Sequence, residues 1–388
     1  MNFEKLKKND NKYILNNYAK FDVAIVKGKG ATLYDYDNKA YIDFGSGIGV
    51  NSFGANDLIW KKAVISQIKM IQHTCNLYYN EPQVKLATLL CKKTGCKKVF
   101  FSNSGAEANE GAIKCARKYS FDKYGENRYE IITLKNSFHG RTMATLSATG
   151  QEDMHKYFQP FSEGFVYVVA NDIEDFYANV NKKTCAVMLE IIQGESGVIN
   201  LTEEYLHKVE EVCKKKDILL IIDEVQTGNG RTGKLYSYMN YHLSPDIVTT
   251  AKGLASGLPI GAVLFFKKTE NTLSTGTHGS TFGGNPVCAA AAYCVLKRLD
   301  EDFLNQVIEK GDYIVKALLA MKKVKSVTGL GLMIGIETDL DAKETAKLLI
   351  KKGLIVLTAK NKIRLLPPLN ITKEEIDTGL NILKEVLN

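Results

Sequence analysis

Residues 217–257 read DILLIIDEVQTGNGRTGKLYSYMNYHLSPDIVTTAKGLASG, and this stretch places an acid and an amine at the ends of two predicted strands. Ile218 to Ile222 form an unbroken apolar run, which is typical of a central strand in a parallel sheet covered on both faces. Asp223 follows this run directly, and Lys252 follows the second β-branched run, 247–250. Because ligands of open α/β sheets bind outside the carboxyl ends of the strands, we expect both side chains in one crevice.

Asp223 and Lys252 have two interpretations. The simpler one is a buried ion pair, but a structural pair more usually has Arg as its cation. The pKa of a Lys falls on burial, and its neutral amine can form an imine with an aldehyde. Gly253 and Gly257 also leave room for a flat ring beside Lys252. Pyridoxal 5'-phosphate needs these two partners, an amine for its aldehyde carbon and a carboxylate that keeps its ring nitrogen protonated.

Four segments of the chain resemble the class III pyridoxal-phosphate-dependent aminotransferases. They read DEVQTG (223–228), GRTGKL (230–235), PDIVTTAKGLASGLPIGA (245–262) and STFGGNP (280–286). The resemblance extends from about Tyr18 to Pro368. It implies an α/β fold of the fold-type-I class, with a mostly parallel seven-stranded sheet in a large domain and a smaller α+β domain.

The order of predicted elements is compatible with that fold. From Lys98 onward strands alternate with helices, which predicts a mostly parallel sheet. The run GAVLFF (261–266) follows too soon after Thr250 for a parallel crossover, so we expect it to run antiparallel. We expect a large cofactor-binding domain over 45–285. Segments 1–44 and 286–388 should form one small domain together, because each alone has a meagre core.

The composition excludes several classes of protein. No apolar run approaches the ~20 residues needed to cross a bilayer, and the N-terminus has no apolar signal region, so we expect a cytoplasmic protein without a membrane partner. The net charge is +8, but the lysines are spread along predicted helix faces, so we expect no nucleic-acid partner. The eight cysteines include no CxxC pair, and we interpret them as reduced thiols without a metal site.

The segment 102–109, SNSGAEAN, follows a predicted strand and begins a predicted helix. It suits a phosphate at the helix N-terminus, and it also suits an ordinary capping box of Ser104 and Glu107. The resemblance assigns the phosphate to Ser104, Gly105 and Ala106. A nicotinamide site would need GxGxxG between a strand and a helix, and the nearest match, at 329–331, lies between two strand-like runs.

Further roles follow from the resemblance alone. It assigns Phe138 to stacking on the cofactor ring, His139 to the cofactor site and Gln226 to the ring hydroxyl. Thr281 would reach the phosphate of a neighbouring subunit, which implies a homodimer. The residues assigned to substrate are Tyr18, Arg141 for the distal carboxylate, Glu195 beside the reacting group and Arg364 for the α-carboxylate of glutamate. Glu190 and Glu195 flank the sequence IIQG, and the resemblance selects Glu195.

These assignments predict an enzyme in which Lys252 holds the cofactor and then moves the proton of the reaction. The resemblance implies transfer of the ω-amino group of N-acetylornithine to 2-oxoglutarate, giving glutamate. Ornithine, succinylornithine, 4-aminobutyrate or a lysine precursor remain alternative donors, because acyl selectivity depends on loop packing. An aminomutase of the same fold would not need separate recognition of two amino acids. A cofactor-dependent regulator would need a DNA-binding domain, for which a first strand beginning by Val23 leaves no room.

Overall fold

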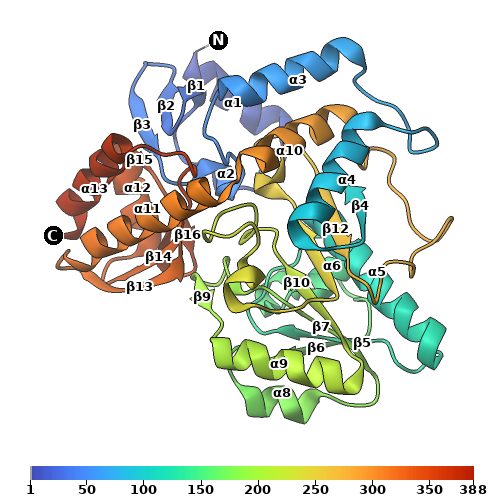
Figure 1. Ribbon diagram of the computed structural model, residues 1–388. Helices are drawn as coiled ribbons and strands as arrows, with labels where there is room; N and C mark the ends of the chain where they lie inside the picture. The colour runs from blue at the N-terminus through green and yellow to red at the C-terminus, as the bar shows by residue number, and fades with distance from the viewer. Residues whose placement is uncertain (1) are drawn as a thin grey trace.

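A twisted seven-stranded sheet forms the centre of the computed structural model, which describes residues 2–388 and leaves Met1 outside (Figure 1). In spatial order its strands are β4 (Lys98–Ser102), β12 (Gly261–Phe265), β11 (Ile247–Thr250), β10 (Leu219–Asp223), β7 (Thr184–Leu189), β5 (Glu130–Leu134) and β6 (Phe165–Val168). Only β12 runs antiparallel to its two neighbours, as its short connection to β11 predicts. The mostly parallel seven-stranded α/β fold is therefore confirmed.

The middle of this sheet is buried on both faces. Leu219 and Ile221 of β10 pack in one hydrophobic cluster with residues of α5 (Gly105–Tyr124), whereas Leu220 and Ile222 pack in the cluster on the opposite face. Successive side chains of a strand point to opposite faces, so this alternation also sets the direction of the next residue. Asp223 therefore points to the α5 face of the sheet.

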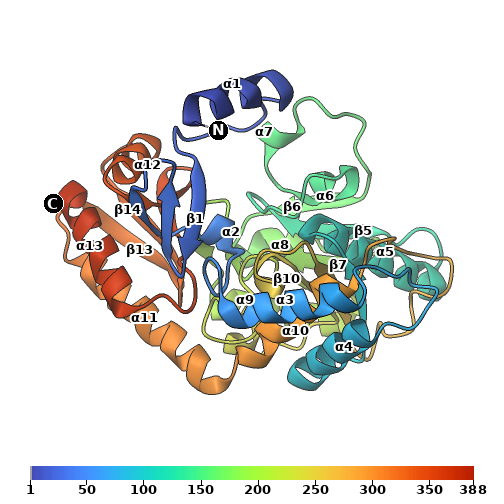
Figure 2. The same ribbon diagram turned by 90° about the horizontal axis from the view of Figure 1, so that it is seen from above.

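Further helices and short elements precede, connect or follow the strands of the large sheet along the chain. They are α3 (Leu58–Met70), α4 (Glu81–Thr94), α6 (Met143–Ala148), α7 (Glu152–His155), α8 (Ile173–Asn179), β8 (Ile192–Gln193), β9 (Ile199–Asn200), α9 (Glu203–Lys216), η1 (Ser237–Tyr241), η2 (Lys252–Leu254) and α10 (Pro286–Arg298). Seen from above, α3 and α10 lie across the sheet region, and α1 (Phe3–Tyr13) lies apart from it (Figure 2). No helix within residues 2–388 has the length and apolar composition that a membrane span requires.

The two ends of the chain share a sheet. Its order is β1 (Ile25–Lys29), β2 (Thr32–Asp35), β3 (Ala40–Asp43) and β15 (Leu354–Ile355), and β15 pairs in parallel with β3. A second small sheet has the order β13 (Val324–Leu330), β14 (Met333–Thr338), β17 (Lys362–Leu365) and β16 (Leu357–Ala359). The helices of this region are α2 (Ser46–Gly49), α11 (Glu301–Leu319), α12 (Ala342–Lys351) and α13 (Lys373–Leu387).

Three features differ from the sequence interpretation. The first strand begins at Ile25 and not by Val23. Helix α1 is not indicated by the sequence pattern, because it has no buried residue that a periodic pattern could reveal. Helix α11 is likewise not indicated as a separate element. It starts anew because the side chain of Asp300 accepts a hydrogen bond from the N–H of Phe303, a helix N-cap directly after α10.

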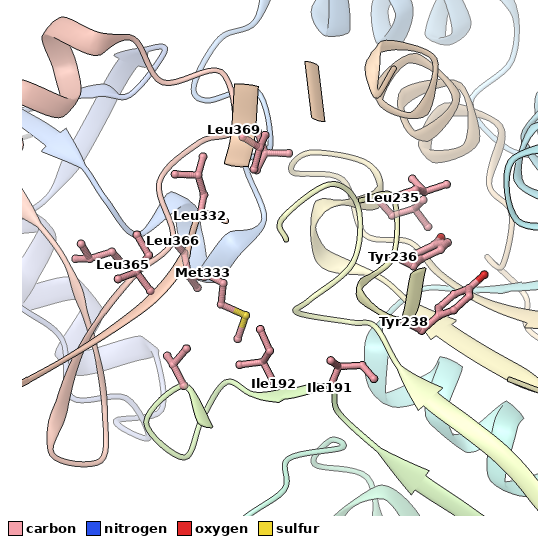
Figure 3. Close-up of a cluster of buried hydrophobic side chains, with 14 of the residues drawn as sticks. Ile191, Ile192, Leu235, Tyr236, Tyr238, Leu332, Met333, Leu365, Leu366 and Leu369 are labelled. Carbon is pink, nitrogen blue, oxygen red and sulfur yellow. The ribbon is translucent and has the colours of Figure 1, made fainter. Parts of the chain in front are cut away.

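Buried side chains join the second small sheet to the large sheet. Figure 3 shows Met333 of β14 directed toward Ile192, which follows β7, with Leu365 and Leu366 nearby. All four side chains are almost inaccessible to solvent. This packing holds β17 over the carboxyl ends of the large sheet's strands, and β17 carries Arg364.

Candidate active site

A cavity of about 410 Å³ lies at the carboxyl ends of the parallel strands, a size typical of small-molecule sites. Most of the residues predicted from the sequence line it together. They are Ser104, Gly105, Ala106, Phe138, His139, Arg141, Asp223, Gln226 and Lys252. Two predicted residues, Glu195 and Arg364, adjoin it through hydrogen bonds with Gln226.

Asp223 is held as a carboxylate acceptor by three donors. Its Oδ2 accepts from Asn109 Nδ2 at 2.7 Å and lies 2.8 Å from His139 Nδ1, and its Oδ1 accepts from the N–H of Val225 at 3.0 Å. The side chain is only 3% exposed. Asn109 is itself oriented, because its Oδ1 accepts from the Thr249 hydroxyl at 2.6 Å. The carboxylate is thus rigidly placed at the cavity wall.

Lys252 occupies a strained backbone position. Its φ is +42°, which is uncommon for a residue other than glycine and is characteristic of functional sites. Burial lowers its pKa, with the positive charge of Arg364 acting in the same direction, while Glu195, Asp223 and Glu190 oppose the shift. The next residue is closely packed, since a Cβ on Gly253 would lie 2.7 Å from Ser52 Oγ and would require a shift there. Burial and the charge of Arg364 therefore favour a reactive, more readily deprotonated amine at Lys252.

The N-terminus of α5 offers free amides to the cavity. The Ser104 hydroxyl accepts from the N–H of Glu107 at 3.2 Å, which is half of the possible capping box. The other half is absent, because Glu107 Oε2 accepts from the N–H and side chain of Asn103 at 2.7 and 2.8 Å instead of from Ser104 N–H. Within residues 2–388 the amides of Ser104, Gly105 and Ala106 donate to no acceptor. Such a helix start binds phosphate.

Phe138 and Arg141 lie on the loop after β5. The guanidinium of Arg141 is 5.6 Å from the centre of the Phe138 ring. Arg141 is exposed, and no carboxylate within residues 2–388 forms an ion pair with it. The loop is anchored from below, because the N–H of Phe138 donates to Glu190 Oε1 at 2.9 Å. Burial raises the pKa of Glu190 to about 7, with the Asp223 charge adding to the rise and His139 opposing it.

Glu195, Arg364 and Gln226 form one cluster. Arg364 Nη1 donates to Glu195 Oε1 at 2.7 Å and to Gln226 Oε1 at 2.9 Å, and its Nη2 donates to Glu195 Oε2 at 3.3 Å. Burial favours a raised pKa for Glu195, but the charge and hydrogen bonds of Arg364 outweigh it and hold the pKa below its usual range. The side chain of Arg364 is 3% exposed, so this carboxylate neutralises a buried cation.

Two predicted site residues lie elsewhere in this chain. Thr281 is exposed on the segment before α10. Tyr18 is 70% exposed and lines a different cavity, formed between α1 and residues 16–25. Neither one borders the cavity that contains Lys252.

The structure adds two buried polar residues to which the sequence interpretation assigns no role. Asn109 is the last residue of the segment 102–109, one turn and a half into the helix. Glu190 precedes Glu195 in the same segment, but nothing in the local pattern distinguishes it from a carboxylate that merely follows a strand. Both are almost fully buried at the cavity.

The polar groups of this cavity fit pyridoxal phosphate. Free helix amides suit its phosphate, and Asp223 suits its ring nitrogen. The buried amine of Lys252 suits its aldehyde. Close packing behind the phosphate site also requires Gly105, because a Cβ there would lie 2.7 Å from Val225 Cγ1.

The chain belongs to the class-III aminotransferases, since the family described as Aminotransferase class-III matches residues 13–387. Aminotransferases of this class depend on pyridoxal 5'-phosphate, which is accordingly the cofactor of this chain. The acetylornithine aminotransferase of Haemophilus ducreyi is 51% identical to the chain over 391 residues, covering 100% of both.

Solved structures agree with this family. The ornithine aminotransferase of Toxoplasma gondii, described with PLP at partial occupancy in its active site, superposes with a TM-score of 0.94 at 31% identity, covering 99% of this chain and 94% of that one. The acetylornithine aminotransferase of Elizabethkingia anophelis superposes with a TM-score of 0.89 at 32% identity, covering 100% and 99%. The two relatives thus share the whole fold.

Proposed function

We propose that this enzyme transfers the ω-amino group of N-acetylornithine to 2-oxoglutarate, giving N-acetylglutamate 5-semialdehyde and glutamate. The similarity to acetylornithine aminotransferases over the full length of the chain supports this donor. The observation that carries the proposal is the unequal state of two arginines at the site. Arg364 is already paired with Glu195, whereas Arg141 lines the cavity without a carboxylate partner within residues 2–388.

This difference between the paired Arg364 and Arg141, which has no carboxylate partner in the described chain, suits an ω-amine donor. The reacting nitrogen of such a donor lies far from its carboxylate, so no substrate anion is available to Arg364, and Glu195 supplies one. The distant carboxylate is then bound by Arg141. Glutamate instead brings its α-carboxylate next to the reacting amine, and it binds Arg364 after Glu195 has moved aside.

The remaining roles concern the cofactor and the proton. Pyridoxal phosphate supplies an electron sink for the reacting carbon. In this assignment the amides of Ser104, Gly105 and Ala106 would bind its phosphate, Phe138 would stack on its ring, His139 would support Asp223, and Gln226 would contact its hydroxyl. Asp223 holds a proton at the ring nitrogen. Lys252, as a neutral amine, would remove the proton from the amine-bearing carbon of the donor and then, as the protonated amine, supply it for the 1,3-shift of the reaction.

A panel of amino donors tests the proposed substrate. Single-turnover kcat/KM should be highest for N-acetylornithine among N-acetylornithine, N-succinylornithine, ornithine, 4-aminobutyrate and a lysine-pathway amine. A higher value for unacylated ornithine or 4-aminobutyrate would replace the proposed donor by that compound. A product with a shifted amino group and no requirement for 2-oxoglutarate would indicate an aminomutase.

Replacing Glu195 by Ala should affect the two half-reactions unequally. Removing one partner of a buried ion pair leaves the other charge uncompensated, so the reaction with N-acetylornithine should slow by about ten-fold or more. The reaction with glutamate should be equal to or faster than that of the wild type, because Arg364 is then free. Single-turnover kcat/KM for each donor measures both losses of transition-state stabilisation. Equal losses for the two donors would mean that Glu195 has only a structural role.

A homodimer completes the proposed site. Large apolar side chains are exposed on α3, on the segment before α4 and beside Thr281, namely Leu58, Ile59, Leu77, Tyr78, Tyr79 and Phe282. A surface of this kind marks a protein interface. The copy that covers it would receive the exposed Thr281 hydroxyl at its own phosphate site.

Thr281 should therefore act in the partner's active site. Thr281→Ala should weaken cofactor retention in the homodimer, measured by dialysis of the loaded enzyme. Mixed dimers of Thr281→Ala and Lys252→Ala subunits should regain activity, because the intact Thr281 of the second subunit serves the intact Lys252 of the first. If mixed dimers are no more active than either parent, Thr281 serves its own subunit or only packs.

A further inference from the structure

Two loops of the active site are joined beneath the cavity. One loop, 135–141, carries Phe138, and the other, 193–196, carries Glu195. Gln193 Nε2 donates to the carbonyl of Lys135 at 3.0 Å, and the Ser196 hydroxyl donates to the carbonyl of Asn136. The ring-stacking loop and the loop that neutralises Arg364 therefore move as neighbours.

Glu190 is the charged group at this junction. Its Oε1 accepts from the N–H of Phe138 at 2.9 Å, and its Oε2 accepts a long hydrogen bond from the N–H of Gly194 at 3.5 Å. Each carboxylate oxygen thus holds a different loop. The side chain is buried, at 5% exposure, and it borders the cavity.

The second loop, 193–196, cannot shift without disturbing the residues that it contacts. The carbonyl of Gly194 accepts from Arg364 Nη1 at 3.0 Å, and a Cβ on Gly194 would lie 2.3 Å from Gln226 Oε1. A small displacement of Gly194 would therefore disturb both Arg364 and Gln226. A displacement of Phe138 would disturb the cofactor ring.

We propose that Glu190 is a positioning residue that couples the two loops, so that one carboxylate sets both the cofactor platform at Phe138 and the donor preference governed by Glu195. Oε1, which accepts from Phe138, sets the cofactor platform. Oε2, which accepts from Gly194, sets the donor preference. The inference rests on the proposed function for the ω-amine donor, for Phe138 as the cofactor platform and for Glu195 as the group that governs donor preference.

Two substitutions distinguish the roles of the two carboxylate oxygens of Glu190. In Glu190→Gln the N–H of Phe138 selects the amide oxygen as its acceptor, which leaves the amide NH₂ facing the N–H of Gly194. This variant should bind pyridoxal phosphate within about three-fold of the wild type, yet change the ratio of kcat/KM for N-acetylornithine over glutamate by about ten-fold, the effect of one lost hydrogen bond. Glu190→Ala should change that ratio and also weaken cofactor binding by about ten-fold or more, because both acceptors are lost.

The readouts are the cofactor dissociation constant, from titration of the cofactor-free dimer, and the donor ratio from single turnovers. Glu210→Ala is the matched control, since Glu210 is a buried carboxylate that accepts a backbone N–H, from Ser244 at 2.6 Å, away from the cavity. It should lower the Tm without changing either readout. If Glu190→Ala does not fold, the ratio and affinity of Glu190→Gln decide alone.

Equal defects in both readouts for the Gln and Ala variants, or no defect in either, would overturn the coupling. Failure of the proposed function looks different. A wild-type enzyme that does not use N-acetylornithine would refute that donor, whereas the two cofactor dissociation constants, and the donor ratio taken with the preferred ω-amine, would still test Glu190.

Discussion

Lys252→Ala should abolish the visible absorption band of the imine that this lysine forms with the cofactor, and it should lower turnover by about 10⁴-fold, the upper range of what a positioned acid–base group contributes. Both effects have one origin. The substitution removes the amine that meets the cofactor aldehyde and the amine that moves the proton. The absorption spectrum of the loaded protein and single-turnover rates measure the two effects separately.

Lys252→Arg tests whether another basic side chain can replace the lysine. Arginine is also a long basic side chain, but it stays protonated at neutral pH, so it can neither form an imine nor act as the base. It should be as inactive as alanine while still retaining cofactor by dialysis. Lys234→Ala, at an exposed lysine of the same long segment, is the control and should behave as the wild type. A retained absorption band in both Lys252 variants would mean that another lysine is the anchor.

Asp223→Ala should leave the cofactor bound but slow the half-reaction by about 100-fold or more, the order of effect found when one preorganised electrostatic group is removed from an active site. Without the carboxylate the ring nitrogen loses its proton, and an unprotonated ring accepts electrons poorly. The measurement is the single-turnover rate with a saturating amino donor.

Asp223→Asn distinguishes charge from hydrogen bonding. Its oxygen can still accept from Val225 or Asn109, so it should fold more stably than the alanine variant, which leaves His139 and Asn109 without their acceptor. If the negative charge of Asp223 keeps the ring nitrogen protonated, the Asn and Ala variants should be similarly slow. A wild-type rate for Asp223→Asn would refute the electrostatic role of this carboxylate.

The central sheet is predictable because its signals are local. Unbroken apolar runs indicate strands buried on both faces, and the short link from Thr250 to GAVLFF requires an antiparallel strand. The positions of Asp223 and Lys252 follow from the rule that parallel strands present their carboxyl ends at one edge. Local sequence patterns do not indicate helices α1 and α11. Helix α1 buries no side chain, and α11 follows α10 with no long break in the helical pattern.

The sequence by itself therefore determined the fold class, the family and the edge of the sheet at which the site lies, because apolar periodicity and contiguous motifs depend only on neighbouring residues. Only the tertiary structure decided that Glu107 binds Asn103 in place of Ser104 and that Glu190 joins two loops. The contacts of Glu190 link segments whose separation depends on the packing of several elements at once, whereas the choice of Glu107 between two neighbouring amides depends on the local geometry of the helix start. Glu195 and Arg364 lie 169 positions apart in the chain, and the packing of β14 and β17 beside β7 is what brings them within hydrogen-bonding distance.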